Sequence, residues 1–426
     1  MIPMMQPFRV LFARTELLLV PLVCFCVMSA FVGAALFSEF SWTDDHEVIS
    51  FIMAPESLAH TIQVDFLEGR FRPLYYALRH LQYHVFGITP FYWHLFVFGV
   101  GVTTLVALYA LVRRFAPPGL AALAVALVFL YPSSSAIWYR LGPQETLGML
   151  LIVLALLMLV RGQYRGFVLL SVLTMYYKET FALLMPALLM LRLAYAIIVR
   201  RESVRSAWFD LFTLAAFGVV PLALMALLRA GDATGYGLVP RNMLTQNVIN
   251  NLVAMTLPVA FMTPIFFAVL GFQRYAVPVL VILLLWMVPQ AVVHGDVFVE
   301  RYYWPSILAP IITTPVALWA LRAYPRVLTL SIALLLLPTP VSYYHLSRQT
   351  EGAARYVTEN AEFQETMRST AAAQPARSEW NYPLSWQVES RWSTVLFLRL
   401  YGYQGPITFG EDCEGLYCDA GLVADP

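Results

Sequence analysis

Long apolar runs recur along most of this sequence, and they constrain its fold more than any other feature. The first run extends from Leu17 to Phe37, and comparable runs follow as far as residue 344. A helix of about 20 apolar residues is long enough to cross the hydrocarbon core of a bilayer. Only 12% of the residues are charged, whereas soluble domains carry about 25%. We therefore predict an all-α polytopic membrane protein.

The apolar runs predict about 11 transmembrane helices. Their expected bounds are 17–37, 91–112, 119–132, 143–160, 166–177, 180–199, 208–228, 251–272, 275–293, 304–321 and 327–344. The runs on either side of Lys178 leave an alternative, in which 166–199 forms one re-entrant or broken unit. The first run is longer than the apolar region of a signal peptide, so we expect it to remain as a signal anchor.

Arginines fall in alternate loops between the predicted helices and so indicate an orientation. These residues are Arg9, Arg14, Arg113, Arg114, Arg161, Arg165, Arg200, Arg201, Arg205, Arg274, Arg322 and Arg326. Basic loops stay in the cytoplasm, which places the N-terminus inside and the C-terminus outside. We expect an integral protein of the bacterial inner (plasma) membrane. Its predicted parts are a transmembrane domain over 1–346, with a first outer catalytic loop at 38–90, and a small extracytoplasmic C-terminal region over 347–426.

An acidic segment follows the first predicted helix directly. Asp44 and Asp45 are adjacent, and His46 and Glu47 come next. A carboxylate here can accept a proton from an attacking hydroxyl or amine. It can also help to hold a divalent cation, so a metal stays open as a cofactor. The alternative is a solvated loop in which Asp caps a helix.

Four basic residues fall at the predicted outer ends of helices or in the first outer loop: Arg72, Arg140, Lys178 and Arg301. Ionisable groups at membrane depth are costly and usually face a cavity or a partner. Lys178 and Glu179 are adjacent and point in different directions on a helix, so we favour a functional Lys178 over a mutually neutralising pair. The alternative for Arg72 is a position in an ordinary solvated loop, with no role in binding. Together these residues predict a cationic pocket for a lipid-anchored phosphate.

Two further features bear on the partners. Cys413 and Cys418 enclose four residues and are candidates for a disulfide if the tail faces an oxidising compartment; a zinc site with two cysteines is less favoured. The net charge of +1 gives no indication of nucleic acid, and we predict no such partner.

Taken in order, these residues resemble the GT-C superfamily of membrane glycosyltransferases, which includes protein O-mannosyltransferases and lipid A aminoarabinose transferases. The segments that carry the resemblance are Asp44-Asp45, Arg72-Pro73, 86–94, 132–145, Lys178-Glu179 and 300–306. The resemblance implies a GT-C-like bundle with outer-face loops and a polyprenyl-phosphate sugar donor. One turn departs from the pattern: relatives read Gly-Arg-x-(Asp/Glu), whereas here Arg140 is followed by Leu141-Gly142-Pro143-Gln144-Glu145.

The same resemblance implies roles for individual residues. Asp44 matches the base that activates the acceptor, and Asp45 assists it. From their charges and positions, independently of the resemblance, we expect Arg72, Arg140, Lys178 and Arg301 to bind the donor phosphate, with Glu179, Tyr302 and His94 in supporting roles. The acceptor is a protein, a lipid or a glycan.

The predicted function is therefore transfer of a sugar from a polyprenyl-phosphate-linked donor to an acceptor at the extracytoplasmic face. Two alternatives stay open: a ligase or polymerase that uses a lipid-diphosphate glycan, and a non-enzymatic transporter of lipid or sugar. The charges cluster at one predicted face and the sequence shows no evident two-fold repeat, which counts against the transporter.

Overall fold

The computed structural model of the chain describes residues 6–41, 45, 57–67, 70–130, 136–230, 264–265, 267–268, 271, 273–293, 304–336, 339–380 and 387–409. Five of the predicted site residues lie outside this part of the chain: Asp44, Arg301, Tyr302, Cys413 and Cys418. Their predicted roles, and most of the predicted helix at 251–272, therefore stay predictions.

The first half of the chain forms a series of helices joined by short turns. In order they are α1 (Gln6–Val32), the 3-10 helix η2 (Gly33–Phe37), α3 (Leu58–Leu67), α4 (Pro73–Phe86), α5 (Pro90–Val112), α6 (Pro118–Leu130), α7 (Ala136–Tyr139), α8 (Glu145–Val160) and α9 (Tyr164–Tyr177).

The second half adds further helices and two short strands. They are η3 (Glu179–Leu184), α10 (Met185–Ala194), the π-helix η4 (Tyr195–Arg200), α11 (Val204–Ala230), α14 (Gln273–Val293), α15 (Trp304–Ala320), η6 (Leu321–Ala323), α16 (Pro325–Leu336), α17 (Thr339–Ala373), β1 (Ser378–Trp380), α18 (Gln387–Leu400) and β2 (Ile407–Phe409). The two strands pair in parallel, with Ser378 opposite Ile407 and Trp380 opposite Phe409.

Proline marks where several of these helices begin. Pro73 and Pro90 occupy the first turns of α4 and α5, where the missing N–H costs no hydrogen bond. Between these two helices, Gly87 has a φ of 56°, a conformation that residues with a Cβ rarely adopt. The indole N–H of Trp93 donates to the Gly87 carbonyl at 3.0 Å. This turn fixes α4 against the start of α5.

Five helices in the described part of the chain are long and apolar enough to cross a membrane: Thr15–Phe37, Pro90–Val112, Glu179–Arg200, Val204–Leu224 and Trp304–Ala323. Shorter apolar helices cover Pro118–Leu130, Glu145–Val160, Val277–Pro289 and Pro325–Leu336. The prediction of a helical membrane protein is confirmed, while the predicted number of about 11 spans stays a prediction.

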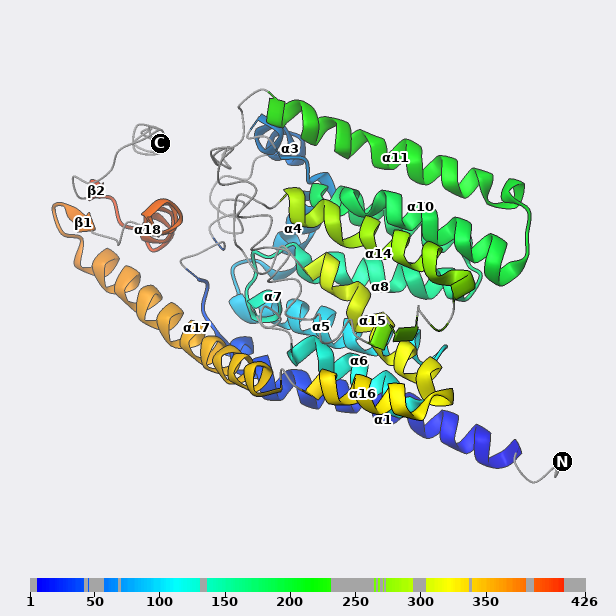
Figure 1. Cartoon of the computed structure of the whole chain (residues 1–426). Helices are drawn as coiled ribbons and strands as arrows, with labels where there is room; N and C mark the ends of the chain where they lie inside the picture. The colour runs from blue at the N-terminus through cyan, green and yellow to red at the C-terminus, as the bar shows by residue number, and fades with distance from the viewer. Residues whose placement is uncertain are drawn as a thin grey trace, which may run out of the picture.

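Most helices lie nearly parallel, and one end of the bundle is more elaborate than the other (Figure 1). Helices α3, α4 and α7 lie at the end away from the N-terminus, and α17 leads from there to α18 and the two strands. We call this the outer end, because the predicted orientation assigns it to the extracytoplasmic face. The first loop and the C-terminal region therefore meet at one end of the bundle.

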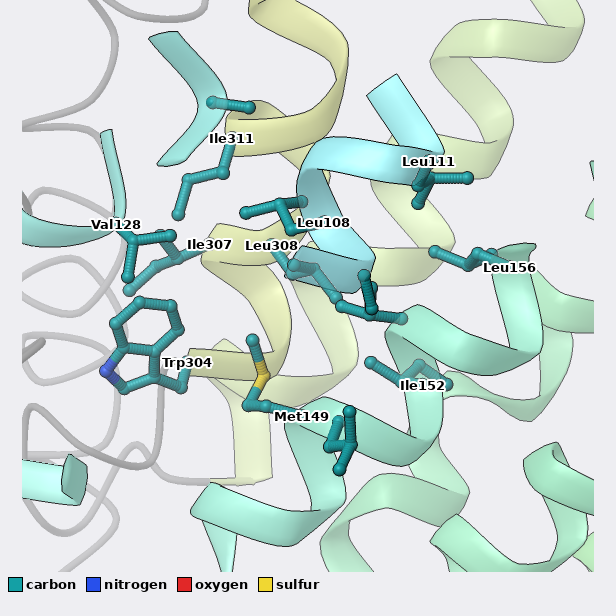
Figure 2. Close-up of a cluster of buried hydrophobic side chains, with 14 of the residues drawn as sticks. Leu108, Leu111, Val128, Met149, Ile152, Leu156, Trp304, Ile307, Leu308 and Ile311 are labelled. Carbon is teal, nitrogen blue, oxygen red and sulfur yellow. The ribbon is translucent and has the colours of Figure 1, made fainter. Parts of the chain in front are cut away.

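The main core lies between α5, α6, α8 and α15. Figure 2 shows that their apolar side chains interlock along the bundle axis: Leu108, Leu111, Val128, Met149, Ile152, Leu156, Trp304, Ile307, Leu308 and Ile311. The helices approach closely here: a Cβ added to Gly148 on α8 would lie only 2.5 Å from the ring of Phe181. Close packing of this kind holds the helix ends, and hence the outer end, in fixed positions.

A second apolar cluster attaches the C-terminal region to the bundle. It joins Phe40 and Trp93 to Met367 of α17 and to Phe397 and Leu398 of α18. The predicted domain boundary between residues 346 and 347 falls inside α17, which continues through it as one helix. The division into two domains stays a prediction, but the two predicted parts share a core.

Candidate functional site

Helix α17 holds the segment that leads into the predicted acidic loop. The side-chain amide of Asn360 donates to the Ser38 hydroxyl at 3.0 Å, and that of Gln364 donates to the Phe40 carbonyl at 2.8 Å. These amides are buried, so each hydrogen bond also satisfies a polar group that water does not reach. The C-terminal region thereby fixes the path of the chain just before Asp44 and Asp45.

Asp45 is completely buried at this end of the bundle. Its Oδ2 accepts a hydrogen bond of 2.6 Å from the backbone N–H of Ser41. Asp45 and Arg140 both lie close enough to Tyr356 of α17 to influence its hydroxyl electrostatically. The predicted assisting acid and one predicted phosphate ligand are therefore brought together, although 95 residues separate them in the sequence (140 − 45).

Tyr356 was not expected from the sequence. Burial, and next the neighbouring Asp45 carboxylate, raise the pKa of this phenol well above 10.0, because both disfavour the phenolate. The Tyr356 ring lies 5.1 Å from that of Tyr139 and 6.3 Å from that of His94, measured between centroids. Tyr356 thus lies between the turn that carries Arg140 and the predicted supporting residue His94.

His94 is buried near the start of α5. Its imidazole approaches the backbones of Glu39 and Tyr139, and the Tyr356 hydroxyl approaches the side chains of Asn360 and Ser41. Buried polar groups are nearly always hydrogen-bonded in folded proteins. His94 and Tyr356 accordingly link the start of α5 and helix α17 to the segment that precedes the acidic loop.

Arg72 forms a buried ion pair with Asp65 of α3. Its Nη2 lies 2.6 Å from Oδ1 of Asp65, and its backbone N–H donates to Oδ2 at 3.2 Å. The Tyr76 hydroxyl accepts from Arg72 at 2.8 Å and donates to Asp65 at 2.9 Å. Arg72 is thus neutralised and held in one orientation, and its predicted role as a phosphate ligand stays a prediction.

Arg79 of α4 is a second buried arginine in this region, and the sequence analysis missed it. Its guanidinium carbon lies 4.9 Å from the ring centroid of Tyr75 and 5.6 Å from that of Trp93. It also donates to the carbonyl of Leu141, so it ties α4 to the turn after Arg140. The sequence spacing could have identified Arg79, because residues 72, 75, 76 and 79 fall on one face of a helix.

Lys178 interrupts the helical path and pairs with Glu145. Its backbone is extended (φ −150°, ψ 126°) between α9 and η3, and the apolar helix Glu179–Arg200 follows it. The choice between two helices and one re-entrant or broken unit stays a prediction. Its Nζ donates to Oε1 of Glu145, and the two side chains are only 6% and 2% exposed. The neighbouring Glu179 is also buried, but the ion pair of Lys178 in the described structure is with Glu145, at the first turn of α8.

The turn from Ala136 to Glu145 connects these groups into one site. It carries Arg140, it receives the hydrogen bond from Arg79, and it ends at the partner of Lys178. Arg79, Glu145 and Arg72 all lie close enough to the buried Tyr177 to interact with it electrostatically. Of the predicted residues that the structure describes, Asp45, Arg72, His94, Arg140, Lys178 and Glu179 therefore lie in one region at the outer end.

The described part of this region contains acidic as well as basic side chains, and the predicted cationic pocket, which includes Arg301, stays a prediction. Among the described residues, the basic side chains of Arg72, Arg79, Arg140 and Lys178 accompany the acidic side chains of Asp45, Asp65, Glu145 and Glu179. Uncompensated buried charge is unstable in a low-dielectric interior, so acids and bases alternate. The ion pairs of Arg72 with Asp65 and of Lys178 with Glu145 hold these two cations in fixed orientations.

Metal binding has no support from the part of the chain that the structure describes. There, no group of three or more His, Cys, Asp or Glu side chains is arranged to hold an ion. Asp44, His46 and Glu47 lie outside that part, so the metal alternative predicted for the acidic segment is not tested.

Comparisons with known proteins bear on the fold. No family model matches the chain, and no curated protein sequence matches it. The crystal structure of ArnT from Cupriavidus metallidurans bound to undecaprenyl phosphate aligns over 94% of this chain and 87% of its own, with a TM-score of 0.53 and 12% sequence identity. The apo state of that protein aligns over 93% and 86%, with a TM-score of 0.50 and 14% identity.

This alignment and the apolar helices make the chain an integral membrane protein. The alignment spans both the helical bundle and the C-terminal region, since it covers nearly the whole chain. The protein thus shares the fold of ArnT, which agrees with the fold that the sequence resemblance led us to expect.

Proposed function

We propose that this protein is a glycosyltransferase that moves a sugar from a polyprenyl-phosphate-linked donor to an acceptor at the extracytoplasmic face. One observation carries the proposal. Buried, oriented basic side chains gather at one end of a bundle whose fold matches a protein solved with undecaprenyl phosphate. A polyprenyl phosphate places its tail in the bilayer and its anion at the depth of these helix ends.

Transfer would occur in a single displacement. The acceptor hydroxyl or amine gives its proton to the Asp44 carboxylate as its oxygen or nitrogen attacks the anomeric carbon. The bond from that carbon to the phosphate oxygen breaks, and its electron pair leaves with the polyprenyl phosphate. Arg72, Arg140, Lys178 and Arg301 would stabilise the negative charge on the departing phosphate.

Asp45, next in the chain to Asp44, supports this assignment. It is buried and anchored to Ser41, so it can orient the acidic segment without exchanging protons with solvent. His94 and Tyr356 lie beside it and can orient the acceptor or the phosphate. Glu179 and Tyr302 keep their predicted supporting roles.

The test uses membranes that contain wild type, Asp44→Asn or Glu379→Gln, with a panel of radiolabelled polyprenyl-monophosphate sugars. Glu379 is a control because its side chain is 71% exposed and lies on β1. We expect transfer with wild type and Glu379→Gln, and loss of transfer with Asp44→Asn at equal membrane insertion.

Other results would contradict the proposal in specific ways. Equal transfer by Asp44→Asn would remove Asp44 from the chemistry. Turnover of diphosphate donors alone would favour the ligase or polymerase. A protein that turns over no donor, but whose Asp44→Asn variant still moves lipid or sugar across sealed vesicles, would be a transporter.

A further inference from the structure

An apolar groove of 550 Å³ lies between α1 and α6, on a side of the bundle away from the candidate site. Both helices pack on α5, which lies between them. Leu19 and Val23 on its rim are 52% and 55% exposed. In a membrane protein, exposed apolar side chains of this kind face lipid.

Small side chains on α6 give the groove its width. Ala122 and Ala126 line it, are exposed, and lie one helical turn apart. Residues four apart lie on the same helix face, so the two alanines form a continuous channel wall. A larger residue at either position would fill the space.

The two ends of the groove differ in chemistry. Toward the outer end it is lined by Phe31 and Phe129, whose rings stack at 4.7 Å between centroids and so bridge α1 and α6. At the other end Tyr109 donates from its hydroxyl to Glu16 at 2.5 Å, and Glu16 lies 2.8 Å from Nε of Arg113. The groove is therefore bridged by aromatic rings near the outer end and polar at the opposite end.

Its length corresponds to one leaflet. From Leu19 to Phe31 is 12 residues (31 − 19), or about 18 Å at ~1.5 Å per helical residue. Half of a hydrocarbon core of ~30 Å is about 15 Å. A single acyl chain of the leaflet on the N-terminal side therefore matches the groove from Tyr109 to the Phe31–Phe129 pair.

We propose that this groove binds an acyl chain of an anionic phospholipid, with the head-group phosphate at Arg113. The Arg113 side chain is 41% exposed, and Arg114 beside it is also exposed, so two arginines oppose the single charge of Glu16. Arginine matches phosphate with a planar fork of donors. The tail of the proposed sugar donor would place its phosphate at the outer end, where the groove-lining residues that the structure describes include aromatic rings and no cation.

Native mass spectrometry of detergent-purified protein tests the groove. We expect wild type to retain one phosphatidylglycerol after delipidation. We expect Ala126→Phe to retain roughly tenfold less, because the ring takes the volume of several CH₂ groups of the chain. The control is Ala216→Phe, since Ala216 is also an exposed alanine and its helix α11 lies on the opposite side of the bundle (Figure 1).

The head-group position has its own matched pair of variants. Arg113→Gln is expected to lower retention of phosphatidylglycerol but not of phosphatidylcholine, because the bound anion loses its cation. Arg322→Gln removes an arginine that stacks on Trp319 at 3.9 Å and is expected to change neither. Equal retention by Arg113→Gln and Arg322→Gln would overturn the head-group assignment.

A measurement on the unaltered protein avoids any folding defect of the variants. Wild type in vesicles of phosphatidylethanolamine and phosphatidylglycerol is photolysed with a phosphatidylglycerol that carries a diazirine on its acyl chain. We expect cross-links to peptides of α1 and α6 around Val23 and Ala126. Uniform labelling of all lipid-facing helices, retention of a polyprenyl phosphate in the groove, or a dimer that Ala126→Phe dissociates would each refute the proposal.

Discussion

The ion pair between Lys178 and Glu145 provides a quantitative test of how this end of the bundle is held. Glu145→Gln keeps the size of the side chain and removes its charge. Lys178 would then be a buried ammonium, with its side chain 6% exposed, and would have lost its ion pair with Glu145. Breaking a buried pair by removing one member costs about 3–5 kcal/mol, a large share of the ~5–15 kcal/mol that stabilises a typical domain.

A double-mutant cycle separates the pair from its members. Lys178→Met removes the ammonium and leaves Glu145 as the unpaired buried charge, so we expect a similar cost of about 3–5 kcal/mol. The variant with both substitutions contains neither charge. We therefore expect the loss in free energy of unfolding for the double variant to be smaller than the sum of the two single losses by at least ~2 kcal/mol. This difference is within the range of coupling energies between contacting residues.

The assay is equilibrium unfolding in mixed micelles of a mild detergent and dodecyl sulfate, followed by tryptophan fluorescence. Glu379→Gln is the matched control, because it removes the same charge from an exposed pair with Arg377, at 3.2 Å and with side chains 71% and 59% exposed. Exposed pairs contribute about 0–1 kcal/mol. If Glu145→Gln costs no more than Glu379→Gln, the buried pair does not hold Lys178 in place, and our account of how this end of the bundle is held is wrong.

Three further predictions concern other residues. Arg72→Lys should cost about 1.5–3 kcal/mol in the same unfolding assay, because a lysine cannot reproduce the paired hydrogen bonds to Asp65; an unchanged free energy would contradict the importance of that geometry. Arg192→Gln should cost about 3–5 kcal/mol, because it breaks the buried pair with Asp210 at 2.8 Å, yet leave polyprenyl-phosphate binding unchanged. A loss of binding at full folding would contradict its purely structural role. Tyr356→Phe should abolish the alkaline loss of stability that Tyr356 causes in wild type. Because its folded pKa is raised above 10.0, its contribution is present below pH 10.0 and is lost as the pH rises through the folded value. Parallel pH profiles for wild type and Tyr356→Phe would refute this linkage.

Local sequence predicted the apolar helices well. The expected bounds 91–112 and 143–160 compare with Pro90–Val112 and Glu145–Val160 in the structure. A hydropathy profile identifies such segments because a helix that crosses the hydrocarbon core needs many apolar residues in succession. The same measure placed a last span at 327–344, whereas α16 ends at Leu336 and α17 begins at Thr339.

Helix α17 shows why the C-terminal region was harder to predict. Its buried positions follow helical spacing: Ala353, Tyr356, Asn360, Gln364, Met367 and Ala371. Two of them are amides that bond to the segment 38–41, so the apolar pattern is weak even though the periodicity is present. A long-range polar contact of this kind leaves no mark on a hydropathy profile.

The sequence by itself determined that the chain is a helical membrane protein and which charged residues are unusual for one. Those conclusions depend on composition and on the cost of charge in lipid, which act locally. Only the tertiary structure decided which buried groups lie near one another: Lys178 beside Glu145, Arg72 beside Asp65, and Asp45 near Tyr356 of α17. A buried charge selects its partner by proximity in space, and helix packing brings together residues that are far apart along the chain.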